Sequence, residues 1–383
     1  MINNKFFGCY LHIPFCKNKC SYCDYYSLTD HSKLLSKYIS SLLQEIKLKG
    51  RKLSTSRELT TIYFGGGTPS ILSPVQFQRL LSALAENFSF ISSGPEITME
   101  VNPLDLQDGC TLQAWKKTGI NRFSLGVQSL ISEELNLLGR EHNREQALQA
   151  LEILQNQNVN YGVDLIYGLP RQSPTSFFFS LERTLDYNPR HISVYNLEVK
   201  PETPLKAEVD ENKLEIMSEK KQAEIFSHLP EKLRQENFIN YEIANYARPG
   251  YQCQHNLYYW KCLNYLGFGP GAHWFWQGSR NKNRCDLIKY IENLEQDKLP
   301  PNQEKNLTGP EAITEFMIMG LRLKWGIIID EFESRFSKSI FYYFAEEIER
   351  LIQENLLLQQ QGRIFLSRRG RKYGNYVFRQ FII

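Results

Sequence analysis

Alternation of apolar, strand-like runs with amphipathic, helix-like segments constrains the fold of this 383-residue chain more than any other feature. Six such pairs fill its N-terminal half, and strands joined through helices normally lie parallel in one sheet. The predicted strands are Gly8–Phe15, Thr60–Phe64, Glu96–Val101, Arg122–Gln128, Tyr161–Tyr167 and His191–Leu197. We therefore predict an α/β fold with a partial (β/α)6 barrel of TIM type, more open than the complete barrel of eight units.

Helical spacing of apolar residues predicts the connecting helices. One begins near Leu34, with Asp30 as its candidate N-cap, and another begins after Ser73. A single long helix is expected over residues 132–157.

We expect the chain to divide into three parts. We expect a barrel domain over residues 1–237 and an aromatic, glycine-rich segment over residues 238–305 that ends in a linker at Pro300–Gln303. Residues 306–383 show three helical patterns, a short strand and a final helix, an order that fits a mostly helical, winged-helix-like domain.

Composition narrows the class of protein. The chain is 42% hydrophobic and 23% charged, which is typical of a soluble globular protein. Its net charge is only +3, from 45 basic and 42 acidic residues, and no basic block suggests a nucleic-acid partner. No apolar run reaches the length of about 18 residues that a membrane-spanning helix needs. Peripheral membrane contact is left open.

The cellular location is predicted from the N-terminus and the cysteines. The first apolar run is short and is interrupted by His12, Pro14 and Lys17, so no signal peptide is expected. The chain has eight cysteines, of which three are clustered, and this usage favours metal chemistry in a reducing compartment over a disulfide framework. We therefore expect a cytoplasmic protein.

Three cysteines follow the first predicted strand as Cys16-x3-Cys20-x2-Cys23. Clustered thiolates are ligands for soft or borderline metals and for Fe–S clusters. Three ligands leave one coordination position open, which is typical of a reactive site. Spacing alone leaves two alternatives, a zinc site with a distant fourth ligand or three unrelated buried cysteines.

Polar residues also occur at the ends of the other predicted strands, the edge where such folds gather their chemistry. The run Gly65–Pro69 follows the second strand, and its glycines allow a ligand to approach the backbone, although such runs are often only tight turns. Four further residues lie at or after strand ends: Glu100, Gln128, Arg140 and Asp164. Their carboxylates could accept from a ribose or an amino group, and the arginine could bind a carboxylate. Taken singly, each is more often a solvated group or a salt-bridge partner.

His255 lies in an aromatic segment that continues through Tyr259 to Trp260. Imidazole is a good iron or zinc ligand, and aromatic faces suit a flat macrocycle. The residues alone favour a hydrogen-bonded core histidine beside packed aromatic rings. The other five cysteines match no zinc spacing and are expected to be buried and free.

The cysteine motif, the glycine run and the six strand–helix units together resemble the radical SAM superfamily. The resemblance implies a [4Fe–4S] cluster on Cys16, Cys20 and Cys23. It also implies that S-adenosylmethionine (SAM) binds the open iron and that an electron donor reduces the cluster, so that SAM yields a 5′-deoxyadenosyl radical.

Five longer stretches resemble the oxygen-independent coproporphyrinogen III oxidase group within that superfamily. They are Tyr10–Cys16, Gly65–Pro69, Glu100–Pro103, Asn121–Ser129 and Asp164–Pro170. By these matches, the contacts to the cluster-bound SAM would come from Tyr10, Tyr22, Gly66 and Glu100. The oxidase holds a second SAM through groups that correspond to Gly67, Thr68, Gln128, Arg140 and Asp164.

Two departures point away from the oxidase. Its additional cysteine is replaced here by Tyr25, and its N-terminal extension before the cluster motif is missing. The motif His255-Asn256-x-x-Tyr259-Trp260 instead resembles the HemW haem chaperones, a sister group. That resemblance implies haem as cargo, His255 as its candidate ligand, and haem-accepting proteins such as respiratory enzymes as partners.

Two functions therefore stand side by side. The first is a haem chaperone that keeps the cluster and SAM. The second is an oxidase that decarboxylates coproporphyrinogen III by radical chemistry, and a structural zinc protein is a third class. Productive SAM cleavage, the number of bound SAM molecules, the mode of haem attachment and the oligomeric state are not predicted.

Overall fold

The six predicted strands form consecutive parallel strands of one sheet. The computed structural model describes residues 5–29, 33–53 and 56–383, so the candidate cap Asp30 lies outside the described residues. The order β1-β2-β3-β4-β5-β6 follows the sequence, as expected for a barrel built by successive helix crossovers. The strands are β1 (Phe6–Ile13), β2 (Glu58–Gly66), β3 (Glu96–Val101), β4 (Arg122–Gln128), β5 (Tyr161–Tyr167) and β6 (His191–Asn196). The predicted α/β partial barrel is confirmed.

The sheet continues beyond both ends of this parallel core. Next to β1 it adds four strands that come late in the chain: β9 (Tyr265–Phe268), β10 (His273–Trp276), β11 (Ser279–Asn283) and β12 (Asn302–Asn306). Next to β6 it adds β8 (Asn245–Ala247) and β7 (Ile239–Asn240). The aromatic segment therefore supplies sheet edge as well as the short helix α9 (Gln254–Trp260).

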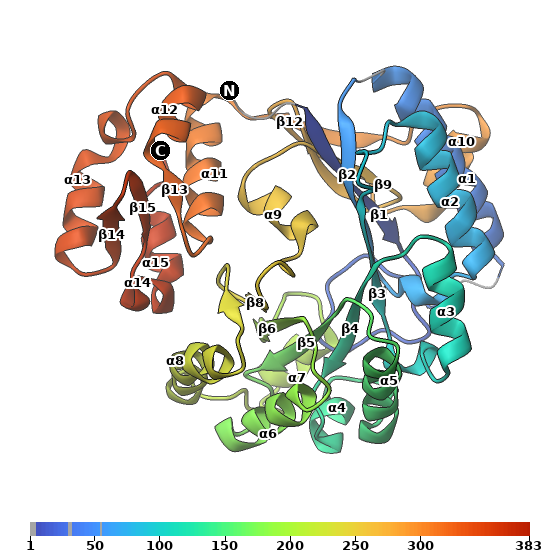
Figure 1. The fold of residues 1–383 in the computed structure, drawn as a ribbon, viewed down its shortest axis with the longest axis horizontal. Coiled ribbons are helices and arrows are strands. Elements are labelled where there is room, and N and C mark those ends of the chain that lie inside the picture. The colour runs from blue at the N-terminus through green and yellow to red at the C-terminus, as the bar shows by residue number, and fades with distance from the viewer. Residues whose placement is uncertain (1–4, 30–32, 54–55) are drawn as a thin grey trace.

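Helices cover the outer face of the curved sheet, and α9 lies on its inner side (Figure 1). Ser73 caps α2 through the predicted contact, since its side chain accepts from the backbone of Gln76. The outer helices are α1 (Leu35–Leu53), α2 (Pro74–Asn87), α3 (Gly109–Lys117), α5 (Arg144–Asn156), α6 (Pro174–Leu185) and α10 (Leu287–Glu295).

The prediction of one helix over residues 132–157 is wrong. The chain forms α4 (Ser132–Leu137) and α5, separated by a turn in which Gly139 has φ = +66°. A glycine adopts this left-handed conformation without steric cost, so the chain can reverse there. The turn places Arg140 beside the strand ends.

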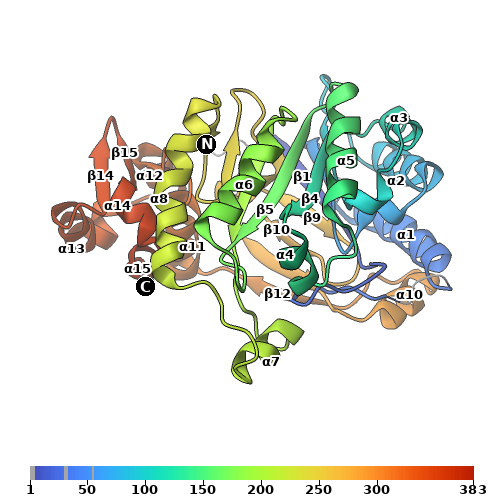
Figure 2. The same cartoon turned by 90° about the horizontal axis from the view of Figure 1, so that it is seen from below.

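The C-terminal part packs around a separate hydrophobic cluster that includes Met317, Phe332 and Leu357. Figures 1 and 2 show it beside the barrel, with α8 (Glu219–Gln235) next to it and α7 (Pro204–Asp210) projecting from the barrel's edge. The helices are α11 (Gly309–Leu321), α12 (Ile329–Phe336), α13 (Ile340–Gln353), α14 (Arg368–Lys372) and α15 (Gly374–Arg379), with a small sheet of β13 (Ile327–Ile328), β14 (Leu357–Gln360) and β15 (Arg363–Leu366). This order matches the expected helical, winged-helix-like domain.

Domain boundaries at residues 237 and 305 stay predictions. The predicted linker overlaps the edge strand β12, which pairs with β11. Across the described part of the chain, no helix is both long and apolar enough to traverse a lipid bilayer.

Candidate functional site

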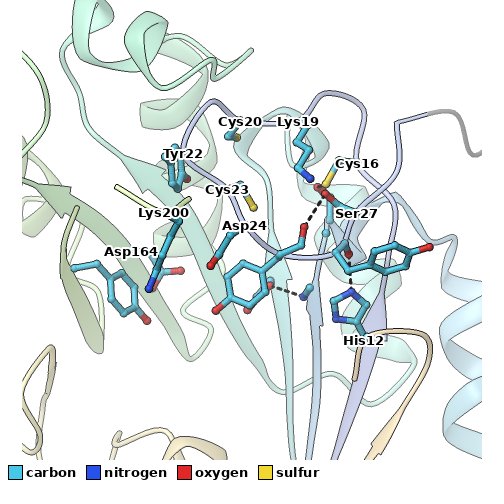
Figure 3. A pocket seen from close by; sticks show the side chains of 18 of the residues that line it. His12, Cys16, Lys19, Cys20, Tyr22, Cys23, Asp24, Ser27, Asp164 and Lys200 are labelled. Atoms are coloured by element: carbon cyan, nitrogen blue, oxygen red, sulfur yellow. Dashed lines mark hydrogen bonds between the residues drawn. The ribbon is translucent and has the colours of Figure 1, made fainter. Parts of the chain in front are cut away.

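A cavity of about 1180 Å³ opens at the C-terminal ends of the parallel strands. It is lined by the three motif cysteines and by every residue that the resemblance assigned to SAM. Figure 3 shows Cys16, Cys20 and Cys23 on the loop after β1, with Asp164 of β5 across the pocket from them. The residues that the sequence analysis assigned to one site thus line one cavity, although their individual roles stay predictions.

The cysteine loop is held in place from both sides. The backbone N–H of Cys16 donates to Leu28 at 3.0 Å, and that of Ser21 donates to Leu138 at 3.0 Å. Two side chains reach the sulfurs directly: Thr68 Oγ1 lies 3.5 Å from Cys16 Sγ, and Arg140 Nη1 lies 3.5 Å from Cys20 Sγ. Donors aimed at sulfur stabilise thiolates, which are the form that ligates metals.

Burial opposes ionisation of two of these thiols. It raises the pKa of Cys16 and raises the pKa of Cys23 to about 11. A bound metal overrides this effect because a coordinating thiol is deprotonated outright. Within the described residues, no three His, Cys, Asp or Glu side chains come close enough to share one ion. The thiolates of a [4Fe–4S] cluster bind three different iron atoms, so the donor set and its spread fit that group.

The glycine turn after β2 has no room for side chains. Gly66 has φ = +111°, and a Cβ there would lie 2.5 Å from Nδ1 of His12. A Cβ on Gly67 would lie 2.5 Å from the carbonyl oxygen of Phe15. The turn thus packs against β1 and presents bare backbone to the cavity, which fits the close approach of a ligand.

Two carboxylates lie on neighbouring parts of the pocket wall. Glu100 accepts from the hydroxyl of Tyr63 at 2.9 Å and from the backbone N–H of Gly66 at 3.2 Å. Burial, with a smaller contribution from Asp164, raises the pKa of Glu100 to about 7. Burial also raises the pKa of Asp164, although Ser124 donates to it at 3.1 Å. A carboxyl whose pKa lies near neutrality is typical of a functional site.

Gln128, at the end of β4, and Arg140, in the turn that follows α4, both line the cavity. Arg140 Nη2 donates to the carbonyl of Gly126 at 2.9 Å, and its buried Nε has no hydrogen-bond partner among the described residues. Gln128 has φ = +65° at the end of β4, a strained conformation that recurs at functional sites. Both fit the recognition of a polar ligand.

Tyr10 and Tyr22 line the same cavity. The hydroxyl of Tyr10 lies 3.1 Å from Nδ1 of His12, whose Nε2 lies 2.8 Å from the carbonyl of Tyr26. Burial lowers the pKa of His12 to about 4, so its ring is neutral at physiological pH and Nε2 donates to that carbonyl. His12 was part of a quoted motif but was given no role, and its contacts show that it supports the wall beneath Tyr10.

His255 does not reach this cavity. It is fully buried, and its Nδ1 and Nε2 lie 2.9 Å from Thr61 Oγ1 and 2.9 Å from Tyr259 Oη respectively. Burial lowers its pKa to about 3. The motif residues that do line the cavity are Asn256, Tyr259 and Trp260. The core arrangement that the residues alone favoured is therefore present.

The far wall of the cavity was missed by the sequence analysis. It consists of side chains from separate parts of the chain: Tyr265, His273, Arg280, Lys282 and Met319. His273 ends the stretch Gly269-Pro-Gly271-Ala272-His273, which belongs to the same family signature as His255–Trp260, but it was given no role. No local motif marks the other residues, since they meet through the pairing of β9, β10 and β11 and the packing of α11.

Comparison with known proteins identifies the family. Residues 10–178 match the Radical SAM superfamily model, and residues 307–373 match that of the HemN C-terminal domain. "Heme chaperone HemW" of Lactococcus lactis is 33% identical over 375 residues, covering 98% of this chain and 97% of the relative. The Bacillus subtilis protein of the same name is 30% identical over 374 residues, covering 97% and 98%. The chain belongs to the HemW haem chaperone family.

A solved structure agrees with this HemW assignment at the level of fold. The chain is similar to the coproporphyrinogen III oxidase HemN from Escherichia coli, with a TM-score of 0.84 and 26% identity. The match covers 99% of this chain and 90% of that one. The family resemblance predicted from the cysteine, glycine and His255–Trp260 motifs is thus confirmed, and the full-length HemW relatives favour the chaperone group over the oxidase.

Proposed function

We propose that this HemW-family chain is a radical SAM protein that binds haem and transfers it to acceptor proteins. Cys16, Cys20 and Cys23 would hold a [4Fe–4S] cluster, and SAM would bind beside it. When bound, these groups supply one-electron chemistry. Reduction by an external donor and a cytoplasmic location belong to the same proposal.

The chain's own residues would orient SAM within the pocket. Glu100 and Asp164 offer carboxylate oxygens to amino or ribose hydroxyl groups, and Arg140 offers its guanidinium to a carboxylate. The glycine turn at Gly66 and Gly67 allows the ligand to lie against the backbone. Tyr10 and Tyr22 close the sides and exclude water.

The single observation that carries the haem proposal is the division of one large cavity into two unlike ends. Its 1180 Å³ exceeds the roughly 300–1,000 Å³ of an ordinary ligand pocket. The cysteines and carboxylates come from β1 to β5 and the loops after them, whereas α9 and β9 to β11 contribute Tyr259, Trp260, Tyr265, His273, Arg280 and Lys282. A flat apolar macrocycle fits the second end, and the near relatives are named as haem chaperones.

Axial ligation by His255 stays a prediction. Both of its ring nitrogens already have partners within the protein, so ligation would require the contact with Thr61 or Tyr259 to break. His255→Ala tests the assignment. A haem spectrum that is unchanged in the variant would remove His255 as a ligand and leave the chaperone role intact.

The second candidate function is oxidation of coproporphyrinogen III, which the likeness to HemN supports. Tyr25 argues against it, because its exposed ring lies at the pocket where the oxidase group carries a further cysteine. The remaining radical SAM residues are compatible with both functions.

Two assays on one anaerobically reconstituted sample separate the candidates. We expect the protein to bind haem, to pass it to an apo-haem protein and to form no protoporphyrinogen IX from coproporphyrinogen III with SAM and a reductant. Formation of protoporphyrinogen IX would overturn the chaperone proposal. Tyr25→Cys is the informative variant, since it restores the missing thiol of the oxidase motif.

A further inference from the structure

A group of basic side chains lies on the hairpin formed by β10 and β11. Lys282 of β11 is directly opposite His273 of β10 in the antiparallel register. Directly opposite residues share a face, and so do residues two apart in a strand, which places Arg280 on this face as well. All three residues line the cavity, whereas Asn281 and Asn283 are buried on the other face.

This face carries almost no compensating negative charge. The only acidic residue in β10, β11 or β12 is Glu304, which is opposite Asn281 and therefore on the other face. Glu315 of α11 does reach the group, but it is bound to Arg280, whose Nε lies 2.9 and 3.1 Å from its two oxygens. Lys282 has no ion-pair partner within the described residues.

The electrostatics of His273 reflect the same excess of positive charge. Burial lowers the pKa of His273, and Lys282 and Arg280 lower it further. Three other lysines line the cavity: Lys200 is paired with Glu198, Lys17 is paired with Asp105, and Lys19 belongs to the cysteine loop. Glu100 and Asp164 lie on β3 and β5, which are separated from the hairpin by several strands, so neither carboxylate is a direct neighbour of Lys282 in the sheet.

Aromatic rings lie on the same wall as this cation, next to Arg280, whose Nη1 donates to the hydroxyl of Tyr265 at 2.9 Å. Tyr259 and Tyr265 pack edge to face with ring centroids 4.8 Å apart, and the Arg280 guanidinium lies over the ring of Phe275 at 4.7 Å. A ligand that is flat and apolar in its body and anionic at one edge would complement this wall, with its body against the rings and its charge on the hairpin.

We propose that Lys282, with His273 beside it, binds the propionate carboxylates of the porphyrin cargo and so fixes the orientation of haem in the cavity. The inference rests on the proposed haem-binding function and adds the recognition site for the ligand's acidic edge. Arg280, neutralised by Glu315, holds the hairpin against α11 and leaves Lys282 as the available cation.

The test compares iron(III) protoporphyrin IX with its dimethyl ester on the full-length, cluster-reconstituted protein. Lys282→Gln should weaken binding of the free acid by about tenfold or more and leave binding of the ester within about threefold of the wild type. Lys282→Arg should restore most of the loss, because arginine also binds carboxylates.

Lys305→Gln is the matched control. Lys305 faces the same side of the sheet from β12, pairs with Glu311 and does not line the cavity, so its loss should alter neither ligand's affinity. Equal binding of the free acid by wild type and Lys282→Gln would overturn this inference alone. Failure of the wild type to bind either porphyrin would overturn the haem proposal on which it rests.

Discussion

Glu100 is the side chain whose environment is most informative at the scale of single residues. It is held between Tyr63 and the turn at Gly66, and burial raises the pKa of its carboxyl from an ordinary 4.5 to about 7. The folded protein therefore binds a proton at Glu100 over a pH range in which the unfolded chain has released it. Such a carboxyl favours folding at low pH and opposes it increasingly as the pH rises.

We predict that Glu100→Gln flattens the dependence of stability on pH. In the wild type, ionisation of Glu100 should lower the free energy of unfolding by about 3 kcal/mol as the pH rises from about 4.5 to 7. Urea unfolding at pH 5 and pH 8 measures the difference. Asp164 retains its own contribution in the variant, and Glu86→Gln, exposed on α2, controls for the substitution. An equal pH dependence in wild type and Glu100→Gln would contradict the prediction.

The cysteines can be tested separately from the carboxylates. Serine at Cys16, Cys20 or Cys23 should abolish the visible absorption of a reconstituted cluster, because an alcohol does not replace a thiolate ligand. Cys110→Ser, on α3, should retain full absorption. The expectation that all five other cysteines are buried is wrong for Cys110 and Cys285, which are exposed. A cluster that persists in all three motif variants would show that the ligand set is wrong.

At the scale of elements, the pocket depends on turns and edges that have little freedom. The glycine turn is pressed against His12, which is itself held by Tyr10 and Tyr26. The basic hairpin is joined to the C-terminal part of the chain through Arg280 and Glu315. Loss of either contact should lower the free energy of unfolding by a measurable amount.

Gly66→Ala should destabilise the protein more than Gly94→Ala does. Both glycines have positive φ, +111° and +79°, but a Cβ at Gly94 meets nothing within 4 Å. We expect about 1 kcal/mol for Gly94→Ala from backbone strain alone, and at least about 1 kcal/mol more for Gly66→Ala from the contact with His12. Urea unfolding of both variants gives the comparison. Equal losses would show that His12 moves aside freely.

Breaking the Arg280–Glu315 pair should weaken the attachment of α11 to the sheet. Arg280→Met leaves the Glu315 carboxylate partly buried without its cation, and we expect a loss of about 1–3 kcal/mol in the free energy of unfolding. Adding Glu315→Leu should recover part of that loss, because the uncompensated charge is then removed. A double variant less stable than Arg280→Met would contradict this account.

Strand bounds could be predicted from the sequence, whereas one turn and one edge strand could not. The strands ending at Val101, Gln128 and Tyr167 have the predicted bounds, and the first and last of them are closed by the turn-forming stretches Asn102-Pro103 and Gly168-Leu169-Pro170. The turn at Gly139 was missed because α4 and α5 share one apolar periodicity. Lys282 was missed for another reason. Its strand is polar and short, and it becomes a pocket wall only through pairing with β10.

At the scale of the whole molecule, the two ends of the cavity belong to different parts of the chain. The cysteine end comes from the loops after β1 to β5, and the proposed porphyrin end comes from β9 to β11, α9 and Met319 of α11. We therefore predict that saturating SAM changes the affinity for haem by less than about threefold. Haem titration of the reconstituted protein with and without SAM measures this, and mutual exclusion of the two ligands would contradict separate ends.

The position of β1 has a consequence for the protein's synthesis. This strand lies between β2 and β9, so that Gly8 is paired with Tyr265. β1 can pair with β2 as soon as both are made, but its other edge stays open until β9 has been made, more than half-way along the chain. Long-range pairing of this kind forms late and slowly. Closure of the sheet beside β1 should accordingly follow the synthesis of β9, and until then the open edge of β1 can pair with other chains.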